Sequence, residues 1–419
     1  MRQNFGISEQ IRRLSREALT DCENAFKRID DICEENTAKV LMAFRQNRIG
    51  SVHLTGTTGY GYGDRGRDAL DAVFAQVTGA SDALVRHSFV SGTNAITTAL
   101  FGVLRPGDTM ISVSGTPYDT LHSTLGLRGE GRNWGSLRDF GITYRELALL
   151  PGGKVDLAAI PEAVRGARMA YIQRSRGYSL RPSITVDEIR EIANIIRQVD
   201  KNIIVAVDNC YGEFAETLEP CDAGADLIMG SLIKNPGGGI ARTGGYIAGR
   251  ADLVELCVHR KNSPGVGRDA GCSLDESKNM YLGLFFAPAV VAAAMKTAAF
   301  AAAMFGRMGY EVSPKADEHR TDIIQSVILG SPGKLAAFCR GIQHAAPIDS
   351  FVTPEAWDMP GYGDPVIMAA GTFHMGASIE LSADGPMREP YAAWMQGGLT
   401  WHSGKLGVMC AAQAMLETC

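Results

Sequence analysis

Lys234 is the residue whose surroundings most strongly suggest chemistry. It follows an apolar stretch at 227–229 with Gly230 and Ser231, and it precedes a glycine-rich run and a second apolar stretch at 246–248. Lysine is rarely fully buried unless something pairs with it. A lysine between two buried strands could form a Schiff base with an aldehyde cofactor, because desolvation lowers the pKa of the amine and makes it nucleophilic. The alternative is a solvated lysine in a glycine-rich loop.

Two features upstream lie where predicted strands meet helices. Ser91, Gly92 and Thr93 precede a predicted helix. Free backbone N–H groups and the helix dipole favour a phosphate at such a point, although Ser, Thr and Gly are also ordinary helix caps. Tyr118, within TPYDT, begins the next predicted helix. An aromatic side chain there could stack on a flat ring, or it could simply pack in the core.

Asp208 closes the apolar run NIIVAV, and Tyr211 follows three residues later. An aspartate at this point can pair with a protonated ring nitrogen and keep a cofactor electron-poor, although turn or N-cap aspartates are common. In chain order, the four features supply a phosphate cradle, a ring stacker, a ring-nitrogen partner and an imine-forming lysine. Pyridoxal phosphate chemistry requires this set from a protein.

The segment 53–68, HLTGTTGYGYGDRGRD, is predicted to be a loop. A dinucleotide-binding fingerprint requires that the G-x-G segment follow a strand and open a helix. The G-x-G segments here lack this context, so we reject that interpretation. Tyr60, Tyr62 and Arg65 in this loop suit anion recognition, because arginine offers a forked set of donors. The alternative is surface decoration without a role.

The elements that must position these residues alternate between strand and helix from residue 83 onward. Predicted strands at 83–89, 109–113, 167–173, 202–207, 227–229 and 246–248 are separated by helices that include 94–104 and 186–199. This pattern predicts an α/β fold with a mostly parallel sheet and helices on both faces. Ligands bind such folds beyond the carboxyl ends of the strands.

The chain is predicted to divide into three parts. Residues 1–50 form an amphipathic helical arm, with the helix over 7–46. Residues 51–290 form the large α/β domain, and residues 291–419 form a smaller α+β domain, with a helix at 332–344 and strands at 366–370 and 378–381. A length of 419 residues fits one large and one smaller domain.

Composition excludes several classes of protein. The net charge of −5 offers no electrostatic footprint for nucleic acid. Nine cysteines are scattered singly, which indicates free thiols in a reducing compartment, and the histidines show no metal-type spacing. The N-terminus lacks the apolar core of a signal peptide, and the apolar segment 284–305 is Ala-rich and contains Lys296, so we expect a buried helix rather than a membrane span. We expect a cytoplasmic protein.

Five motifs carry a resemblance to a known family: SGTNAI, GTPYDTLH, DNCYGEF, SLIKNPGGG and ELSADGPMREPY. Over roughly residues 50–407 the chain resembles the aluminium-resistance or methionine-γ-lyase-like proteins. These are similar to the cystathionine lyases among the fold-type-I pyridoxal-phosphate enzymes. The resemblance implies that fold, with a smaller C-terminal domain, and pyridoxal 5'-phosphate as cofactor.

The resemblance also assigns roles to residues around the cofactor. It makes Lys234 the cofactor-bearing lysine and the base that removes the substrate Cα proton, and it makes Asp208 the partner of the ring nitrogen. Tyr211 would hydrogen-bond the ring hydroxyl, and Tyr118 would stack on the ring and act as acid or base at the leaving group. The phosphate cradle would consist of Ser91, Gly92, Thr93 and Ser231.

Further residues are implied at the rim of the site. Tyr62 and Arg65 resemble a tyrosine–arginine pair that reaches the phosphate from a neighbouring subunit, and their spacing here is Tyr-x-x-Arg. Tyr60 is an alternative to Tyr62 in this pair, and we otherwise expect it to contact the substrate. Arg388, after SIELSAD, is the choice for the substrate carboxylate, and Arg174 and Arg176 are rivals.

The expected activity is β- or γ-elimination on a sulfur-containing amino acid, which gives a 2-oxo acid, ammonia and a thiol. The expected assembly is a homo-oligomer, a dimer of dimers with active sites shared between subunits, which binds no nucleic acid, membrane or metal. Substituent replacement, transamination or aldol cleavage would use the same cofactor, and a catalytically idle stress-related scaffold is the alternative from another class.

Overall fold

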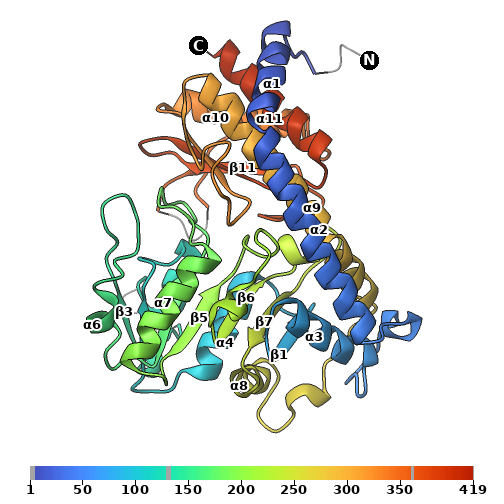
Figure 1. Ribbon diagram of the computed structural model, residues 1–419, viewed down its shortest axis with the longest axis vertical. Coiled ribbons are helices and arrows are strands. Elements are labelled where there is room, and N and C mark those ends of the chain that lie inside the picture. The colour runs from blue at the N-terminus through green and yellow to red at the C-terminus, as the bar shows by residue number, and fades with distance from the viewer. Residues whose placement is uncertain (1–4, 129–133, 360–362, 419) are drawn as a thin grey trace. The chain divides into compact units, whose positions relative to one another are not determined.

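A computed structural model describes residues 5–128, 134–359 and 363–418 (Figure 1). The chain forms two compact units, one of residues 36–285 and one of residues 1–35 together with 286–419. The predicted division into 1–50, 51–290 and 291–419 stays a prediction, because compactness alone does not define domains.

The larger unit is built on a seven-stranded sheet with the order β1-β7-β6-β5-β4-β2-β3. Its pairs are parallel except for the two that involve β7. The strands are β1 (Asp82–Arg86), β2 (Thr109–Ser112), β3 (Thr143–Glu146), β4 (Met169–Gln173), β5 (Ile204–Asp208), β6 (Leu227–Ser231) and β7 (Gly245–Gly249). The predicted mostly parallel sheet is confirmed, although β3 was not foreseen.

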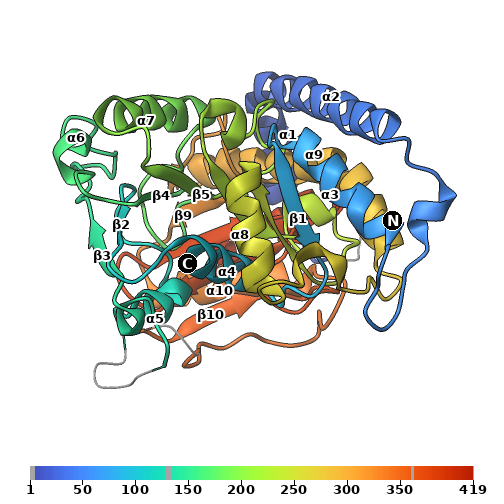
Figure 2. The ribbon, with the colours of Figure 1, turned by 90° about the horizontal axis from the view of Figure 1, so that it is seen from below.

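Helices cover both faces of this sheet. Figure 2 shows α7 on one side of the strands and α4 with α8 on the other. The start of α7 is specified locally, because Thr185 and Glu188 form a reciprocal capping box. The helices of this unit are α3 (Arg65–Val77), α4 (Gly92–Val103), α5 (His122–Leu125), α6 (Ile160–Ala163), α7 (Val186–Val199) and α8 (Ala251–Lys261).

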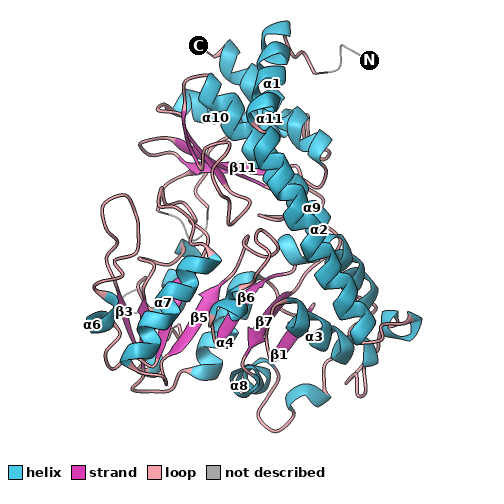
Figure 3. Ribbon diagram, in the orientation of Figure 1, coloured by secondary structure: helices cyan, strands magenta, loops and turns pink. Residues whose placement is uncertain are grey.

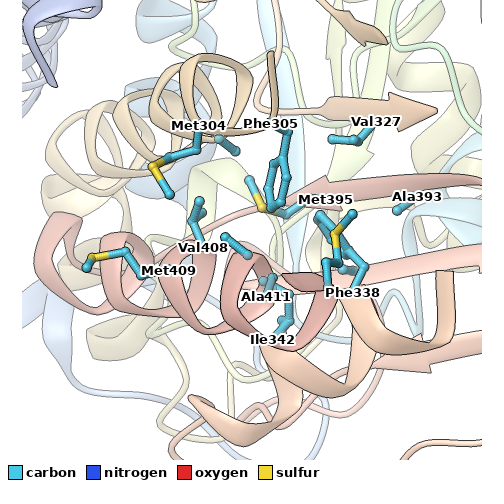
Figure 4. Packing of buried hydrophobic residues seen from close by; sticks show 14 of the residues in the cluster. Met304, Phe305, Val327, Phe338, Ile342, Ala393, Met395, Val408, Met409 and Ala411 are labelled. Carbon is cyan, nitrogen blue, oxygen red and sulfur yellow. The ribbon is translucent and has the colours of Figure 1, made fainter. Parts of the chain in front are cut away.

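The smaller unit contains a five-stranded antiparallel sheet with the order β10-β11-β12-β9-β8, whose strands are coloured magenta in Figure 3. The strands are β8 (Glu311–Ser313), β9 (Gln325–Ile328), β10 (Val366–Ala369), β11 (Ser382–Pro386) and β12 (Ala392–Gln396). Helices α10 (Pro332–His344) and α11 (Trp401–Glu417) supply the rest of its core. In Figure 4, Phe305 and Phe338 pack among methionine and small aliphatic side chains.

One predicted strand of this unit is wrong. The strand expected at 378–381 begins only at Ser382. Glu380 is buried and accepts hydrogen bonds from the backbone N–H groups of Phe373 and His374, at 2.8 and 2.9 Å. Its carboxylate therefore fixes a loop instead of joining the sheet. The sequences of β8, β9 and β12 show no clear alternation of apolar and polar residues, so these strands could not be predicted.

The long helices also differ from their expected form. The single helix expected over 7–46 is two helices, α1 (Glu9–Asp21) and α2 (Glu23–Gln46), separated at Cys22. The Ala-rich segment lies within α9 (Ser277–Arg307), which is long and apolar enough to cross a membrane. The most apolar window of α9 is 72% buried inside the protein, as in the core helix of a soluble protein.

Candidate active site

Three strand ends bring polar side chains to one edge of the large sheet. Asp208 is the last residue of β5, and its Cα partners on the neighbouring strands are Gln173, the last residue of β4, and Met229 of β6. Ser231 ends β6 two residues further on. Because β4, β5 and β6 are parallel, their carboxyl ends face the same side, where open α/β sheets bind ligands.

Asp208 is a buried carboxyl group with few partners. It is 6% exposed, and one oxygen accepts a hydrogen bond from the backbone N–H of Cys210 at 3.1 Å. The other lies 3.4 Å from the Tyr171 hydroxyl, a long contact. Burial raises the pKa of Asp208, while the Lys234 charge and the hydrogen bonds oppose the rise. A further cation at this carboxyl group would stabilise its charged form.

Lys234 lies beside Tyr211, with Nζ 3.9 Å from the centroid of the ring. Burial lowers the pKa of its ammonium group, but the charges of Cys210, Tyr211 and Asp208 and a hydrogen bond with Tyr211 raise it, and the net shift is upward. Cys210 is itself held neutral by burial, which leaves Asp208 and Tyr211 as the groups whose charge can favour the Lys234 ammonium. Desolvation therefore lowers the pKa of Lys234 as expected, but the groups around it outweigh this effect in the protein alone.

Asn235 fixes the lysine loop to the loop after β5. Its side-chain amide donates to the backbone carbonyls of Tyr211 and Glu213, at 2.9 and 2.8 Å. Tyr211 itself has a left-handed backbone conformation, with φ of 71°, which few non-glycine residues adopt. The bonds from Asn235 hold this conformation and place the Tyr211 ring next to Lys234.

The amino end of α4 lies directly against Ser231. A Cβ atom added at Gly92 would stand 3.1 Å from the Ser231 Cβ atom and 3.3 Å from the Cys210 sulfur. Ser91 caps the helix by accepting from the Asn94 N–H at 3.1 Å. The backbone N–H groups of the first helical turn and the Ser231 side chain thus form a small cradle of donors.

Tyr118 is tied to the same sheet edge. Its backbone N–H donates to the Gln173 side chain at 2.6 Å, and its ring stands edge-on to Tyr178 with centroids 6.0 Å apart. The helix expected to begin at Tyr118 is reduced to a 3-10 turn over Asp119–Leu121 and the single turn of α5.

The loop expected over 53–68 ends at Asp64, so Tyr60 and Tyr62 lie in the loop while Arg65 is the first residue of α3. Tyr60 and Tyr62 are 73% and 68% exposed, and their rings stack with centroids 5.4 Å apart. Buried Asp64 holds the loop by accepting from Thr57, Ser273 and the Arg67 N–H. Within one chain, none of the contacts described for this loop reaches Lys234.

The three candidate arginines have different environments. Arg388 lies in the turn between β11 and β12, in the smaller unit, and forms an ion pair with Asp364 at 2.8 Å. Arg174 is fully buried and donates to Asn209 and Glu216 at 2.7 and 2.6 Å. Arg176 is also buried. Arg174 is committed to the interior, which removes it as a rival for the substrate carboxylate.

Replacing Arg174 by alanine is expected to destabilise the protein by about 3 kcal/mol, because Glu216 and the buried Glu219 would lose their counter-charge. The thermal midpoint at fixed protein concentration measures the effect. Arg190→Ala is the matched control, since its pair with Asp187 is solvent-exposed and such pairs contribute about 0–1 kcal/mol. Equal midpoints for the two variants would contradict this role of Arg174.

Several residues of the site were not predicted. Gln173, Asn235 and Cys210 contact the predicted residues, and each adjoins a strand end or the lysine, which is the signal that could have found them. Tyr171 lies inside a uniformly buried strand and carries no such signal. Among the residues that the structure describes, no group of three or more His, Cys, Asp or Glu side chains could hold a metal ion.

Comparisons with known proteins agree with this geometry. The model of the methionine gamma-lyase family matches residues 11–416. The uncharacterized protein YnbB of Bacillus subtilis (strain 168) is 48% identical over 98% of this chain and 97% of its own. The crystal structure of a carbon-sulfur lyase involved in aluminum resistance from Clostridium novyi NT is 48% identical, covers 97% of this chain and 96% of its own, and has a TM-score of 0.93.

A more distant structure shares the fold. The pyridoxal-5'-phosphate dependent protein YhfS from Escherichia coli is 17% identical, covers 93% of this chain and 97% of its own, and has a TM-score of 0.63. The resemblance stated from the motifs and the expected fold are both confirmed.

Proposed function

Because this chain belongs to the methionine gamma-lyase family, we propose that it eliminates a β- or γ-substituent, a thiol, from a sulfur-containing amino acid. It is a pyridoxal-phosphate-dependent carbon–sulfur lyase, and the proposed products are a 2-oxo acid, ammonia and the thiol. The observation that carries the proposal is the meeting of Asp208, Lys234 and the Gly92–Ser231 contact at one sheet edge.

The residues at this edge fit pyridoxal phosphate. The cradle at the amino end of α4, which a side chain at Gly92 would fill, suits a phosphate, with Ser91, Thr93 and Ser231 around it. Asp208 is a buried carboxyl group whose described hydrogen-bond contacts are the Cys210 N–H and, at 3.4 Å, the Tyr171 hydroxyl. It would hold the ring nitrogen in its protonated form. Tyr211 would face the ring hydroxyl, and Tyr118 would stack on the ring.

When bound, pyridoxal phosphate supplies an aldehyde and a ring that withdraws electrons from the substrate Cα. Lys234 would hold the aldehyde through its Nζ atom and would take the proton from the substrate Cα. In the protein alone the Asp208 charge favours the Lys234 ammonium, which is neither a nucleophile nor a base. A ring nitrogen paired with Asp208 would remove this effect, and the pKa of Lys234 would then fall toward the range in which the amine is a nucleophile and a base. Tyr118 would donate or accept the proton at the leaving group.

The remaining contacts are proposed from the resemblance. Arg388 would bind the substrate carboxylate and Tyr60 would contact the substrate. Tyr62 and Arg65 would reach the phosphate of a second copy of the chain, which their exposure within one chain allows. The assembly would then be a homotetramer with shared sites, located in the cytoplasm.

Substrate and reaction are tested by product analysis. The protein loaded with pyridoxal phosphate is incubated with methionine, cystathionine, cysteine and homoserine derivatives, without any added acceptor. A 2-oxo acid, ammonia and a thiol in equal amounts from one of them are expected. Amino transfer that requires a 2-oxo acid acceptor, or an aldehyde product, would instead establish transamination or aldol cleavage.

Replacing Gly92 by alanine is expected to weaken pyridoxal phosphate binding about tenfold, because the added methyl group intrudes on Ser231 and Cys210 and overpacking costs about 1–3 kcal/mol. Equilibrium dialysis of the cofactor measures the change. Gly333→Ala is the matched control, since it lies in the first turn of α10 and a Cβ atom there meets nothing within 4 Å. An unchanged affinity in Gly92→Ala would place the phosphate elsewhere.

A further inference from the structure

A second buried carboxyl group, Glu213, lies next to the proposed cofactor site and has no role in the mechanism above. It is 2% exposed, and Oε1 accepts a hydrogen bond from the Tyr246 hydroxyl at 2.8 Å. Oε2 is buried without a hydrogen-bond partner among the described residues. A Cβ atom at Gly230 would stand 2.5 Å from Oε1, so the carboxyl group lies against the backbone of β6 one residue before Ser231.

A chain of hydrogen bonds connects Glu213 to the buried Arg174. Arg174 donates to the Asn209 side-chain oxygen at 2.7 Å, and the Asn209 amide lies 3.3 Å from the Tyr246 hydroxyl. Tyr246 then donates to Glu213. The same Asn209 amide also donates to Glu219 at 2.9 Å. Each donor in the chain points toward Glu213, so the chain ends on that carboxyl group.

Among the described residues, the cations near Glu213 are already engaged by other carboxylates. Arg174 is already shared by Glu216 and the buried Glu219, and Lys234 faces Asp208. A buried charge without a partner is costly, and the group gives up its charge instead.

The titratable groups that face Glu213 agree with this assignment. They are Tyr246 from β7, Cys210 and Glu219 from the segment after β5, and Lys234 from the segment after β6. Burial raises the pKa of Glu213 to about 8. A hydrogen bond from its own backbone, the Tyr246 hydrogen bond and the Lys234 charge lower the pKa, and the Glu219 charge raises it. Tyr246 and Cys210 are held neutral by their own burial.

We propose that Glu213 is a positioning residue of the Lys234 site, present as a neutral carboxylic acid that packs with Tyr246 against β6 beside Ser231. Its main-chain carbonyl accepts from Asn235, the neighbour of Lys234, so the same residue braces both sides of the site. Ionisation of Glu213 adds a negative charge near Lys234 and the strand end. The proposal deepens the proposed function, and its first two tests are made on the cofactor-free protein.

Infrared spectroscopy of the cofactor-free chain tests the neutral form directly. The wild type minus Glu213→Gln difference spectrum at pH 7 is expected to contain the C=O stretch of a protonated carboxylic acid, and this band should disappear with a midpoint near pH 8. Subtraction isolates Glu213 from Asp208, whose pKa is also raised. Carboxylate bands at pH 7 in place of the acid band would overturn the proposal.

Thermal midpoints as a function of pH give a second readout. Because the pKa of Glu213 is raised from 4.5 to about 8 on folding, the folded chain holds an extra proton between these values, and its stability falls as the pH rises through this window. Glu213→Gln has no proton to lose, so its midpoint relative to wild type should rise steadily between pH 5 and pH 8. Exposed Glu162→Gln is the control and should follow wild type. A pH-independent offset for Glu213→Gln would overturn the proposal.

The loaded protein tests the link to the site. The absorbance of bound pyridoxal phosphate in wild type is expected to change near pH 8, and this transition should be absent from Glu213→Gln. In Tyr246→Phe it should move to higher pH, because the lost hydrogen bond favoured the carboxylate. Identical titrations in all three proteins would overturn the positioning role. Failure to bind the cofactor at all would overturn the proposed function, while the two cofactor-free tests would still decide the state of Glu213.

Discussion

Replacing Lys234 by alanine is expected to abolish covalent attachment of pyridoxal phosphate and to lower turnover on the order of 10⁴-fold, the upper range for loss of a general base. The side chain lies beside Tyr211 and within the field of Asp208, and Asn235 fixes the loop that carries it. No second lysine is described in contact with Asp208. The cofactor absorbance and the elimination rate measure the effect.

Lys278→Ala is the control for this variant. Lys278 is exposed in the first turn of α9, so its loss should leave the absorbance and the rate unchanged. A Lys234→Ala protein that still eliminates the thiol at a rate within tenfold of wild type would show that another group removes the Cα proton.

Asp208→Asn is expected to lower turnover on the order of 10²–10³-fold while the fold is retained, a range typical for loss of one electrostatic contact in a water-excluded site. Asparagine has the same shape but no charge, so it cannot hold a ring nitrogen in its protonated form. The pKa of Lys234 should also fall in the cofactor-free variant, because the Asp208 charge helps to raise it. Steady-state kinetics and the pH dependence of cofactor attachment measure the two effects.

Asp187→Asn is the matched control, because Asp187 is exposed in the first turn of α7 and forms an ion pair with Arg190 at the surface. Its kinetics should equal those of wild type. A kcat for Asp208→Asn equal to that of the control would mean that the charge of Asp208 does not act on the cofactor ring.

The alternation of short apolar runs with helical segments was sufficient to predict the large sheet and the edge formed by the carboxyl ends of its strands. Strands β4, β5 and β6 are buried on both faces, so each reads as a continuous apolar run that ends in a polar residue. The ends of these runs therefore located Asp208 and Ser231 at a common edge, where the structure adds Gln173. The antiparallel sheet of the smaller unit was harder to predict, because β11 reads SADGP and carries no apolar pattern.

The electrostatics of the site could not be predicted from residue types. Desolvation lowers the pKa of Lys234, but the charges of Cys210, Tyr211 and Asp208 and a hydrogen bond with Tyr211 outweigh it, and the fold brings these groups together. Glu213 gave no signal either, since DNCYGEF does not reveal that its carboxyl group turns inward beneath Gly230. Buried networks join residues far apart in sequence, such as Arg174 and Tyr246, and spacing along the chain does not indicate them.

The most direct test of the account is borohydride reduction of the loaded protein followed by peptide mapping with mass spectrometry. One phosphopyridoxyl group per chain is expected, carried by the peptide that contains Lys234. The Lys234→Ala protein should yield no phosphopyridoxyl-modified peptide. A modified peptide that carries the group on any other lysine, or a bound cofactor that borohydride does not fix to the chain, would contradict the assignment of Lys234.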